Sequence, residues 1–421
     1  MGWIRDGVRS QIHDILEEGE VVVVHIAGLI KVGVTPGSET IEIRVGLACI
    51  LMQDAVVTGV SHAIAVAVEL LEIGGIDTVV AEVAKAIPVG IGLVGMEFAT
   101  IFTNAYLPEL HPDPDERGRI SGDGWAFGYA GGVLALIAMI ALFQSGANGR
   151  TMAGLTPLFG LDPVTKADTR IVGPLAAIWY AVFMIPFFLY VRDTPKPGAQ
   201  RYRVGAGLSD LLRTLRGLPK HPSLLAYLGS SMFYRDALNG MYTFGGVYAL
   251  GVLDWSIQEI GIFGILAAIS GAVFCVLGGR IDRRIGPMPV IVACCIILVA
   301  TACLIISLGP NSVMGVSLPE GSALPDILFY VAGASIGAAG GALQASSRNM
   351  LTRQGNPERM TEAFGLYALS GKATSFLAPA LIALASDLTG SQRLGITPVV
   401  GLFIVGLILL AWVKPKGDFA T

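Results

Sequence analysis

The feature that most constrains this chain is a series of apolar runs, each long enough to cross a lipid bilayer as a helix, which takes about 20 residues. From residue 83 onward the sequence predicts nine transmembrane helices, at 86–107, 123–144, 171–191, 224–253, 256–279, 287–308, 326–347, 363–386 and 395–413. The composition agrees, because 53% of the residues are hydrophobic and 14% are charged, against about 25% charged in soluble domains. An all-α integral membrane protein surrounded by a lipid bilayer is the predicted class.

Residues 1–82 do not follow this pattern. Their longest run without Asp, Glu, Lys or Arg, 55–68, has 14 residues, which suits an interfacial or packed segment better than a span. The stretch EVVVVHIAGLI has the β-branched residues of a strand, and GSETIEIRV alternates weakly. Periodicity therefore leaves the type of structure open, and we treat 1–82 as an atypical N-terminal region.

The remaining chain divides at a charged, proline-containing linker. The predicted parts are a first membrane part at 83–191, a linker at 192–223, a second membrane part at 224–413 and a tail at 414–421. A faint internal repeat, in which Glu-Arg is followed by Ala-Phe-Gly, begins at Glu116 and again at Glu358. Repeats of this kind are common in transporters and support a design in two halves.

The connections between the predicted helices alternate in basic residues. Every second one is rich in Lys and Arg: Arg117 and Arg119; seven residues of the 192–220 linker; Arg280, Arg283 and Arg284; Arg348, Arg353 and Arg359; and Lys414 and Lys416. Basic residues favour the cytoplasmic side of a membrane. The sequence thus predicts a multi-pass protein of the cytoplasmic membrane, which is the inner membrane in a bacterium, with a cytoplasmic C-terminus.

The predicted span 224–253 carries charged residues in its middle. Placing a charged side chain inside a bilayer costs free energy, so such residues are interpreted as functional unless shown otherwise. Arg235, Asn239 and Tyr242 share one helical face, and Asp236 lies one step around from it. This pattern is typical of a helix that lines a watery cavity. The alternative is that Arg235 and Asp236 only pair with neighbouring helices and hold the bundle together.

Polar residues on other predicted spans extend this candidate site, namely Glu97, Asn104, Gln344 and Lys372. We expect Arg235 to bind an anionic group of a substrate or to pair with a carboxylate. Asp236 or Glu97 could carry a coupling proton, with Lys372 as a counter-ion. The amides of Asn239, Gln344 and Asn104 could orient a substrate through hydrogen bonds.

A glycine-flanked loop is predicted between the spans 256–279 and 287–308, with the sequence GGRIDRRIG. A tight turn needs glycine, and its carboxylate and guanidinium groups can form ion pairs at the membrane surface. We assign a gating role to this loop through Gly279, Asp282, Arg283, Arg284 and Gly286. Plain anchoring by basic residues is the alternative, but it would not account for Asp282 or the glycines.

Two ridges of glycines at helical spacing allow close helix packing: Gly124, Gly128 and Gly132, and Gly333, Gly337 and Gly341. Such ridges suit helices that rock against each other, although static packing explains them equally well.

Other functional classes lack support in the sequence. The five histidines show no metal-ligand spacing, and neither a G-x-S-x-G motif nor a P-loop occurs. We therefore expect no enzyme, no catalytic residue, no metal and no cofactor. The five cysteines lie in apolar runs without a C-x-x-C motif, and no basic cluster is long enough to bind nucleic acid.

Several separated blocks carry a resemblance to a known family. The GGRIDRRIG loop resembles the G-x-x-x-D-R-x-G-R signature of major facilitator superfamily transporters. More narrowly, the chain from about residue 95 to residue 413 looks like the bacterial relatives of the autophagy-linked vacuolar effluxer branch, through the blocks NAYLPEL, DERGRISGDGWAFGYAGG, MFYRDALNGMYTFGGVYA, GGALQASSRNM, AFGLYALSGKATSFLAPAL and LTGSQRLGI.

This resemblance implies twelve helices in two six-helix bundles, both termini in the cytoplasm and alternating access to a central site. The nine predicted helices would be helices four to twelve, and residues 1–82 stand where helices one to three would be, without the first-half copy of the signature. The expected function is secondary transport of a small polar solute, with an amino acid as one candidate and protons as the candidate coupling ion, by a monomer. The alternative is a non-transporting or incomplete member that acts as a scaffold.

Overall fold

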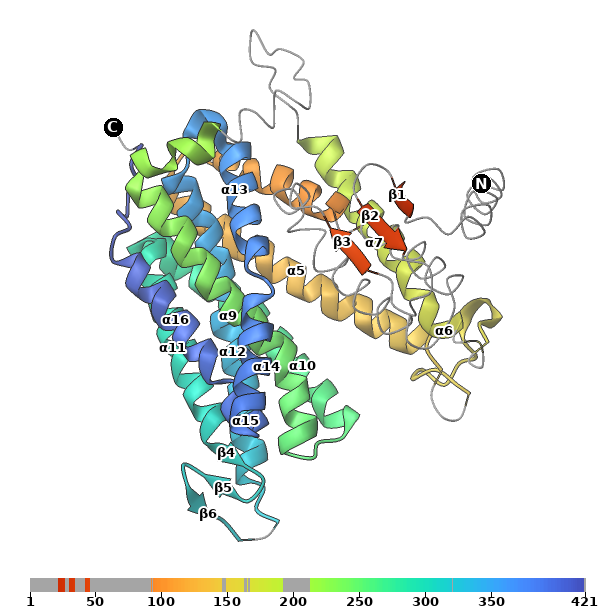
Figure 1. The fold of residues 1–421 in the computed structure, drawn as a ribbon. Helices are drawn as coiled ribbons and strands as arrows, with labels where there is room; N and C mark the ends of the chain where they lie inside the picture. Colours follow the sequence, from red (N-terminus) through yellow and green to blue (C-terminus); the bar gives the residue numbers. More distant parts are fainter. Residues whose placement is uncertain are drawn as a thin grey trace. The chain divides into compact units, whose positions relative to one another are not determined.

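The computed structural model divides the chain into two compact units, Met1–Phe98 and Ala99–Thr421 (Figure 1). The residues that it describes are 22–26, 30–34, 42–45, 92, 94–145, 149–162, 165, 167–191, 213–319 and 321–419. Most of 1–82 and the linker from 192 to 212 lie outside them, so the predictions for those segments remain predictions.

The first unit contains a small antiparallel sheet. Its strands β1 (Val22–Ile26), β2 (Ile30–Val34) and β3 (Glu42–Val45) pair in that order. The register sets Val32 opposite both Val24 and Ile43. β1 and β3 fall in the two stretches whose strand character was too weak to decide from periodicity, whereas β2 lies almost wholly between those stretches; β-branched residues favour such pairing. The fold is therefore mostly helical rather than all-α.

The second unit is built from long helices, and we call its residues 99–191 the first half and 213–413 the second half. The first half contains α4 (Leu107–Leu110), α5 (Pro114–Leu142), α6 (Ala167–Arg170) and α7 (Val172–Tyr190). The second half contains α9 (Pro222–Val252), α10 (Ile257–Ile285), α11 (Pro287–Ser307), α12 (Leu324–Gln354), α13 (Met360–Ala373), α14 (Leu377–Thr389), α15 (Gln392–Gly395) and α16 (Thr397–Leu410). A second small sheet, β4 (Leu308–Gly309), β5 (Ser312–Val313) and β6 (Val316–Ser317), connects α11 to α12.

Fewer helices than predicted have the length and apolarity of a membrane span. Among the described residues there are seven such spans, at 114–142, 172–190, 259–285, 287–307, 324–354, 357–389 and 392–410. The count of nine is therefore not confirmed, nor are two complete six-helix bundles. The predicted span 224–253 does form the continuous 31-residue helix α9, but its charged and polar residues make it less apolar than the others.

Two helix ends were predicted wrongly. The segment Gly278–Ile285, predicted as a loop, forms the last turns of α10, and the turn itself is confined to Gly286, with φ +85°. Glycines were interpreted there as turn residues, but they let α10 pack closely on its neighbours. Likewise, α12 continues to Gln354, so Arg348 and Arg353 lie on a helix and not in a connection.

The core of the second unit lies among α9, α11, α12 and α16. Tyr227 and Tyr234 of α9, Phe329 of α12 and Phe403 of α16 are fully buried there. Burial of such side chains stabilises a helical bundle by dispersion and close packing. By contrast, α7 buries none of its residues within the described structure, as expected of a helix that faces lipid.

Close glycine contacts join α5 of the first half to α10 of the second. A Cβ atom on Gly122 would lie 2.4 Å from the carbonyl oxygen of Cys275, and one on Gly279 would lie 2.8 Å from that of Gly118. Further along α5, a Cβ on Gly128 or Gly132 would meet nothing within 4 Å. The two helices thus touch through their backbones near Gly122, whereas near Gly128 the contact is made by the side chain of Tyr129, which lies against Gly271 of α10.

The second glycine ridge packs along its whole length. A Cβ on Gly333, Gly337 or Gly341 of α12 would come within 2.3, 2.0 and 2.7 Å of Phe263, Ala267 and Cys275 of α10. The interpretation as a packing ridge is therefore confirmed for α12, whereas on α5 the close contacts are made by Gly118 and Gly122.

These contacts predict opposite effects for two alanine substitutions on α5. Gly122→Ala should destabilise the protein by about 1–3 kcal/mol, because the new methyl group collides with the α10 backbone. Gly128→Ala is the matched control and should be neutral or stabilising by up to about 1 kcal/mol, since it has open space and gains helix propensity. Unfolding midpoints in detergent measure both, and equal effects would contradict the close packing at Gly122.

Candidate functional site

The helix α9 carries four of the predicted site residues, and its two central charges face a break in a neighbouring helix. Pro222 stands at the first position of α9, where its fixed φ favours helix initiation. The predicted span 363–386 is interrupted, because α13 ends at Ala373 and α14 begins at Leu377.

Arg235 contacts α13, on the near side of this break. Its Nη1 donates to the carbonyl oxygen of Tyr367 at 2.8 Å, and the guanidinium carbon lies 4.1 Å from the centre of the Tyr367 ring. A Cβ on Gly371 would lie 2.6 Å from Nη1, so the absence of a side chain there makes room for the guanidinium. A cation over an aromatic face is a favourable contact.

Asp236 contacts α14, on the far side of the break. It is fully buried, and its Oδ2 accepts a hydrogen bond from the backbone N–H of Ala378 at 2.9 Å. A carboxylate at a helix N-terminus compensates an unpaired N–H and the positive end of the helix dipole. Its Oδ1 is buried without a partner among the described residues. The two charges therefore hold both segments of the broken helix, which gives them a structural role.

The other predicted site residues lie in several places. Tyr242 is exposed on α9, with its hydroxyl 3.5 Å from that of Tyr129 on α5 and within reach of Gln344 on α12. Asn239 is exposed one turn earlier on α9. The structure thus brings Tyr242 and Gln344 together, beside a tyrosine from the first half.

Two further predicted residues are Lys372 and Glu97. Lys372 is part-buried in the last turn of α13, where a cation favours the negative end of the helix. Glu97 belongs to the first unit, where it is part-buried in a helical stretch.

An arginine that the sequence analysis placed in a connection is an additional candidate. From α12, Arg348 donates through Nη1 to the Asn104 side-chain oxygen at 2.8 Å, through Nε to Ser121 Oγ at 3.0 Å and through Nη2 to the Ser121 carbonyl at 2.9 Å. The predicted site residue Asn104 is therefore a partner of this cation. The signal that could have found Arg348 is its place one helical turn after Gln344, on the same face.

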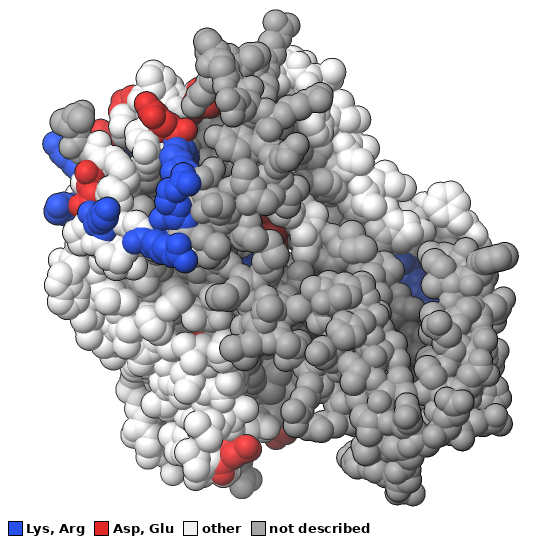
Figure 2. All heavy atoms as spheres, turned by 45° about the horizontal axis from the view of Figure 1, so that its top comes forward, with Lys and Arg blue, Asp and Glu red and all other residues white. Residues whose placement is uncertain are grey.

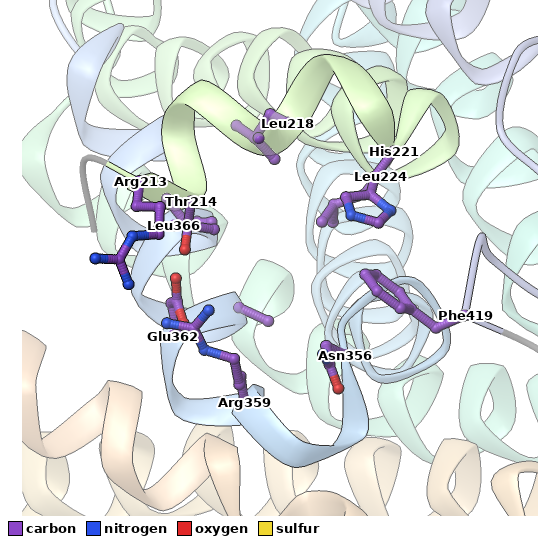
Figure 3. A pocket seen from close by; sticks show the side chains of 12 residues that line it. Arg213, Thr214, Leu218, His221, Leu224, Asn356, Arg359, Glu362, Leu366 and Phe419 are labelled. Carbon is purple, nitrogen blue, oxygen red and sulfur yellow. The ribbon is translucent and has the colours of Figure 1, made fainter. Parts of the chain in front are cut away.

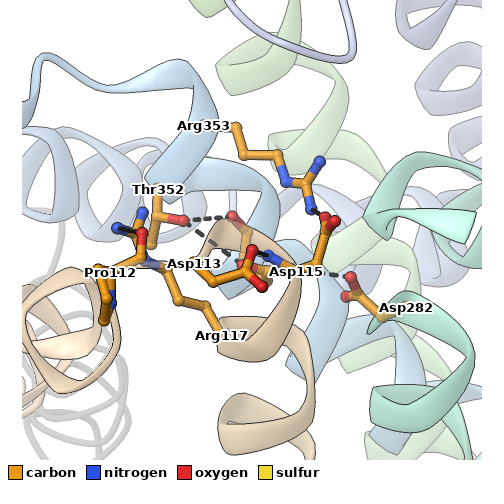
Figure 4. A network of polar contacts seen from close by, with 8 residues as sticks. Pro112, Asp113, Asp115, Arg117, Asp282, Thr352 and Arg353 are labelled. Carbon is orange, nitrogen blue, oxygen red and sulfur yellow. Dashed lines mark hydrogen bonds and ion pairs between the residues drawn. The ribbon is translucent and has the colours of Figure 1, made fainter. Parts of the chain in front are cut away.

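The ends of α5, α10 and α12 meet in a polar cluster that we call the polar end (Figure 4). Asp282 of α10 is fully buried, and its Oδ1 accepts a hydrogen bond from Asn349 Nδ2 of α12 at 2.8 Å. The N-terminal part of α5 packs directly on this carboxylate, since a Cβ on Gly118 would lie 2.6 Å from Oδ1. A buried carboxylate is thus enclosed by both halves.

Ion pairs surround this cluster and cross between the halves. Arg283 of α10 lies 2.6 Å from Glu116 of α5, and Arg353 of α12 lies 2.8 Å from Asp115 of α5. Arg284 is exposed nearby on α10. Figure 2 shows Lys and Arg side chains gathered with Asp and Glu over the surface at this end. Of the predicted gating residues, Gly279, Asp282 and Arg283 thus contact the first half.

A pocket of about 210 Å³ opens at the polar end of the second half (Figure 3). Arg359 and Glu362 form an ion pair of 2.6 Å on one side of it, and His221 stacks on Phe419 on the other, with ring centres 4.6 Å apart. The Thr214 hydroxyl and Glu362 Oε1 are buried there without a hydrogen-bond partner among the described residues.

The tail beside this pocket is fixed to the start of α9. Asp418 accepts a hydrogen bond from the Ser223 backbone N–H at 2.8 Å and lies 3.1 Å from Lys414 Nζ. Burial alone would raise the pKa of Asp418, but hydrogen bonds from Lys414 and from the backbone of Ser223 and Leu224 outweigh it and hold the pKa below its usual value. The carboxylate therefore stays ionised near neutral pH and caps α9.

The chemistry of this arrangement is that of binding and ion pairing. Within the described parts of the chain there is no group of three or more His, Cys, Asp or Glu residues that could hold a metal ion. The side chains instead offer guanidinium donors, amides and tyrosine hydroxyls between helices, all of which bind polar solutes.

Comparison with protein-family models assigns most of the chain. Residues 83–417 match the model of a family described as "Vacuole effluxer Atg22 like". This match covers the second unit and leaves out the atypical N-terminal region.

Curated relatives agree with this match. The Bacillus subtilis (strain 168) protein YxiO, described as an uncharacterized MFS-type transporter, is 23% identical over 329 residues, which cover 77% of this chain and 70% of that protein. Autophagy-related protein 22 of Cryptococcus neoformans is 25% identical over 312 residues, covering 69% of this chain and 49% of the relative. The chain spans about half the length of the fungal relatives that it matches.

Solved structures show the same fold. The crystal structure of the E. coli fucose:proton symporter FucP aligns with a TM-score of 0.53 at 14% sequence identity, covering 87% of this chain and 86% of that one. A second FucP structure, in an outward conformation, aligns with a TM-score of 0.51. These likenesses identify the fold of a major facilitator superfamily transporter.

The contact between Asp236 and α14 predicts a measurable loss of stability. Asp236→Ala should cost about 1–3 kcal/mol, because the buried N–H of Ala378 loses its acceptor. Asp236→Asn retains an acceptor oxygen and should cost less. Asn239→Ala, on the exposed side of the same helix, is the control and should stay within about 0.5 kcal/mol of the parent. Chemical unfolding in detergent gives these values, and equal losses for Asp236→Ala and Asn239→Ala would rule out the cap.

Proposed function

The chain belongs to the vacuole effluxer Atg22-like family, and from this premise we propose that it is a secondary transporter that moves a small polar solute by alternating access. Family membership supports transport in general, and the chain is a multi-pass integral membrane protein with a major facilitator fold. The solute, an amino acid in the first instance, and coupling to protons are the further parts of the proposal.

The observation that carries the proposal is the unequal contact between the two halves. Near Gly122 the helices α5 and α10 touch through their backbones, and ion pairs such as Arg353 with Asp115 cross the same end. At Gly128 and Gly132 a Cβ atom on α5 would meet nothing within 4 Å, and there the contact with the second half is made by the side chain of Tyr129, which lies against Gly271 of α10 and Tyr242 of α9. An interface of this kind can close at either end in turn if the halves rock, which is the motion of alternating access.

The distribution of basic residues supports an orientation for this interface. The polar end holds Arg280, Arg283, Arg284, Arg353 and Arg359, so the positive-inside rule favours the cytoplasm on that side. We therefore propose that the structure corresponds to a state closed to the cytoplasm, in the cytoplasmic membrane, with a cytoplasmic tail. A single chain forms both halves of this interface, in keeping with a monomer.

Roles for the individual residues follow from their contacts. Arg235 has neutral partners in the described structure and could bind an anionic group, while the unpartnered Oδ1 of buried Asp236 could take a proton. Glu97 is the other candidate proton carrier and Lys372 a counter-ion. Asn239, Tyr242, Gln344 and Asn104 provide hydrogen-bonding groups for orienting a solute.

Asp282, Arg283 and Arg284, at the end of α10, are proposed to gate the polar end, with Gly279 and Gly286 shaping the close approach and the turn. Asp282 contacts both halves, and Arg283 pairs across them. Breaking these contacts should therefore change the rate of switching more than the affinity for solute.

A non-transporting relative is the second candidate. The observation that favours it is the three-stranded sheet in residues 22–45, a region in which this fold would have transmembrane helices. The family match, which begins at residue 83, agrees with an N-terminal region of different origin.

Solute uptake into proteoliposomes distinguishes the two candidates. We expect purified full-length chain to accumulate at least one solute from a mixed pool of amino acids and small organic anions, faster with an imposed pH gradient than without. Arg235→Ala should abolish this uptake. Folded protein that moves no solute of the pool would support the non-transporting candidate.

The ion pair between Asp115 and Arg353 allows a charge-swap test of the gate. Asp115→Arg and Arg353→Asp should each change the uptake rate by about fivefold, as expected for an ion pair of about 1 kcal/mol, and the double swap should restore at least half of the parent rate. Exchanging Lys414 and Asp418, a pair within the C-terminal tail that does not cross between the halves, is the matched control and should leave the rate nearly unchanged. Additive effects of the two single substitutions would contradict a shared role in gating.

A further inference from the structure

We propose that Arg348 is the residue that recognises the charge of the solute, and that the solute carries a carboxylate or phosphate group which competes with the first half for this guanidinium. The inference rests on the proposed transport function and deepens it, because it names the substrate class and links substrate binding to release of the closed end.

The first argument is the charge balance around Arg348. In the described structure its hydrogen bonds go to one amide oxygen, one hydroxyl and one backbone carbonyl, all of them neutral, and no ion pair is formed. A guanidinium has five N–H groups, so these bonds leave two for a ligand. A cation on a membrane helix costs free energy unless it pairs with another group, and such residues usually have a function.

The second argument is a neighbouring cation in the same state. Arg235 donates to the Tyr367 carbonyl and lies over the ring of that tyrosine, again without an ion pair among the described residues. Tyr367 also acts electrostatically on Arg348. Two guanidinium groups with neutral hydrogen-bond partners, one from α9 and one from α12, thus act on the same tyrosine. Two cations in one apolar region favour the binding of an anion.

The third argument is access. Arg348 is only part-buried, and the nearest glycine of α5 on this side, Gly124, is exposed. A Cβ on Gly124 would lie 3.4 Å from Nη2 of Arg348, and one turn further along, at Gly128, the space is empty. The guanidinium therefore lies where the close backbone contact between α5 and the second half gives way to a side-chain contact through Tyr129, and we infer that a solute can reach it from the open space on the glycine face of α5.

The hydrogen bonds of Arg348 also link anion binding to the contact between the two halves. Asn104 and Ser121 belong to the first half, and Arg348 belongs to the second, so its three hydrogen bonds tie the halves together next to the polar end. An anionic group bonds to a guanidinium more strongly than neutral acceptors do. A bound anion would take over these donors and weaken the tie, whereas a neutral solute of the same shape would not.

Binding to the purified full-length chain in detergent tests this proposal without requiring transport. The probes are succinate, N-acetylglycine and methyl phosphate, with succinamide and N-acetylglycinamide as neutral partners of the two carboxylates. We expect at least one anion to raise the thermal unfolding midpoint with a saturable dose response, and the neutral partners to have no effect. Comparison of the carboxylates with methyl phosphate identifies which anionic group is bound.

Substitutions at Arg348 then assign the site. Arg348→Gln should weaken the apparent affinity for the anion about 10- to 100-fold, the range for a lost charge-assisted contact. Arg348→Lys keeps the positive charge but loses the planar guanidinium, so it should lose less affinity for the anion than Arg348→Gln. This second variant distinguishes a loss of binding from a folding defect in the Gln variant. Arg393→Gln is the matched control and should bind like the parent, because Arg393 is a part-buried arginine of α15 that lies beside Gly309, at the end of α11 away from the polar end.

The results separate this inference from the transport proposal. Equal responses to anions and amides, an unchanged affinity in Arg348→Gln, or no response to any anion would each overturn the inference. Anion binding that depends on Arg348, but without uptake of any solute in proteoliposomes, would support the inference and count against transport. Uptake of succinamide as fast as of succinate would support the transport proposal and overturn the inference that Arg348 selects an anionic solute.

Discussion

A charged group between packed helices must find a partner, and much of this structure follows from how that requirement is met. Asp236 is matched by the start of α14, Arg235 by a carbonyl and ring of α13, and Asp282 by Asn349. In each case the partner is a helix end, a backbone group or an amide, and none is a charge of opposite sign. Such pairing satisfies each buried carboxylate only in part, since Oδ1 of Asp236 and Oδ2 of Asp282 have no hydrogen-bond partner among the described residues, and it keeps each contact weak enough to be exchanged.

The glycine contacts and the charges depend on each other. Because Gly118 has no side chain, α5 can approach Asp282 closely enough to enclose it, and Gly371 makes the same room for Arg235. A larger residue at either place would force the charge away from its partner. Close helix packing here therefore brings charged groups to their partners, in addition to providing van der Waals contact.

Much of the second unit could be predicted from the sequence, and the failures have physical causes. α7 and α11 agree with the predicted spans to within a residue, because long apolar runs with clear ends are the strongest signal. The end of α10 was missed because glycines signal a turn unless a neighbouring helix packs on them. The break between α13 and α14 has Gly371 before it and Pro379 after it, a signal that the sequence analysis did not use, and its contact with Asp236, 142 positions away along the chain, could not be seen from local sequence.

The candidate site was predicted in part, and Arg348 shows why the rest was not. Sequence reasoning counted it among the basic residues of a connection, since a charge near the end of an apolar run usually marks the membrane border. In the structure α12 runs on for six residues beyond Arg348 to Gln354, which places the guanidinium between the halves. Whether an arginine anchors a membrane edge or faces an interface is decided by the length of the helix that carries it, and here that length is set by packing against α10 and α11.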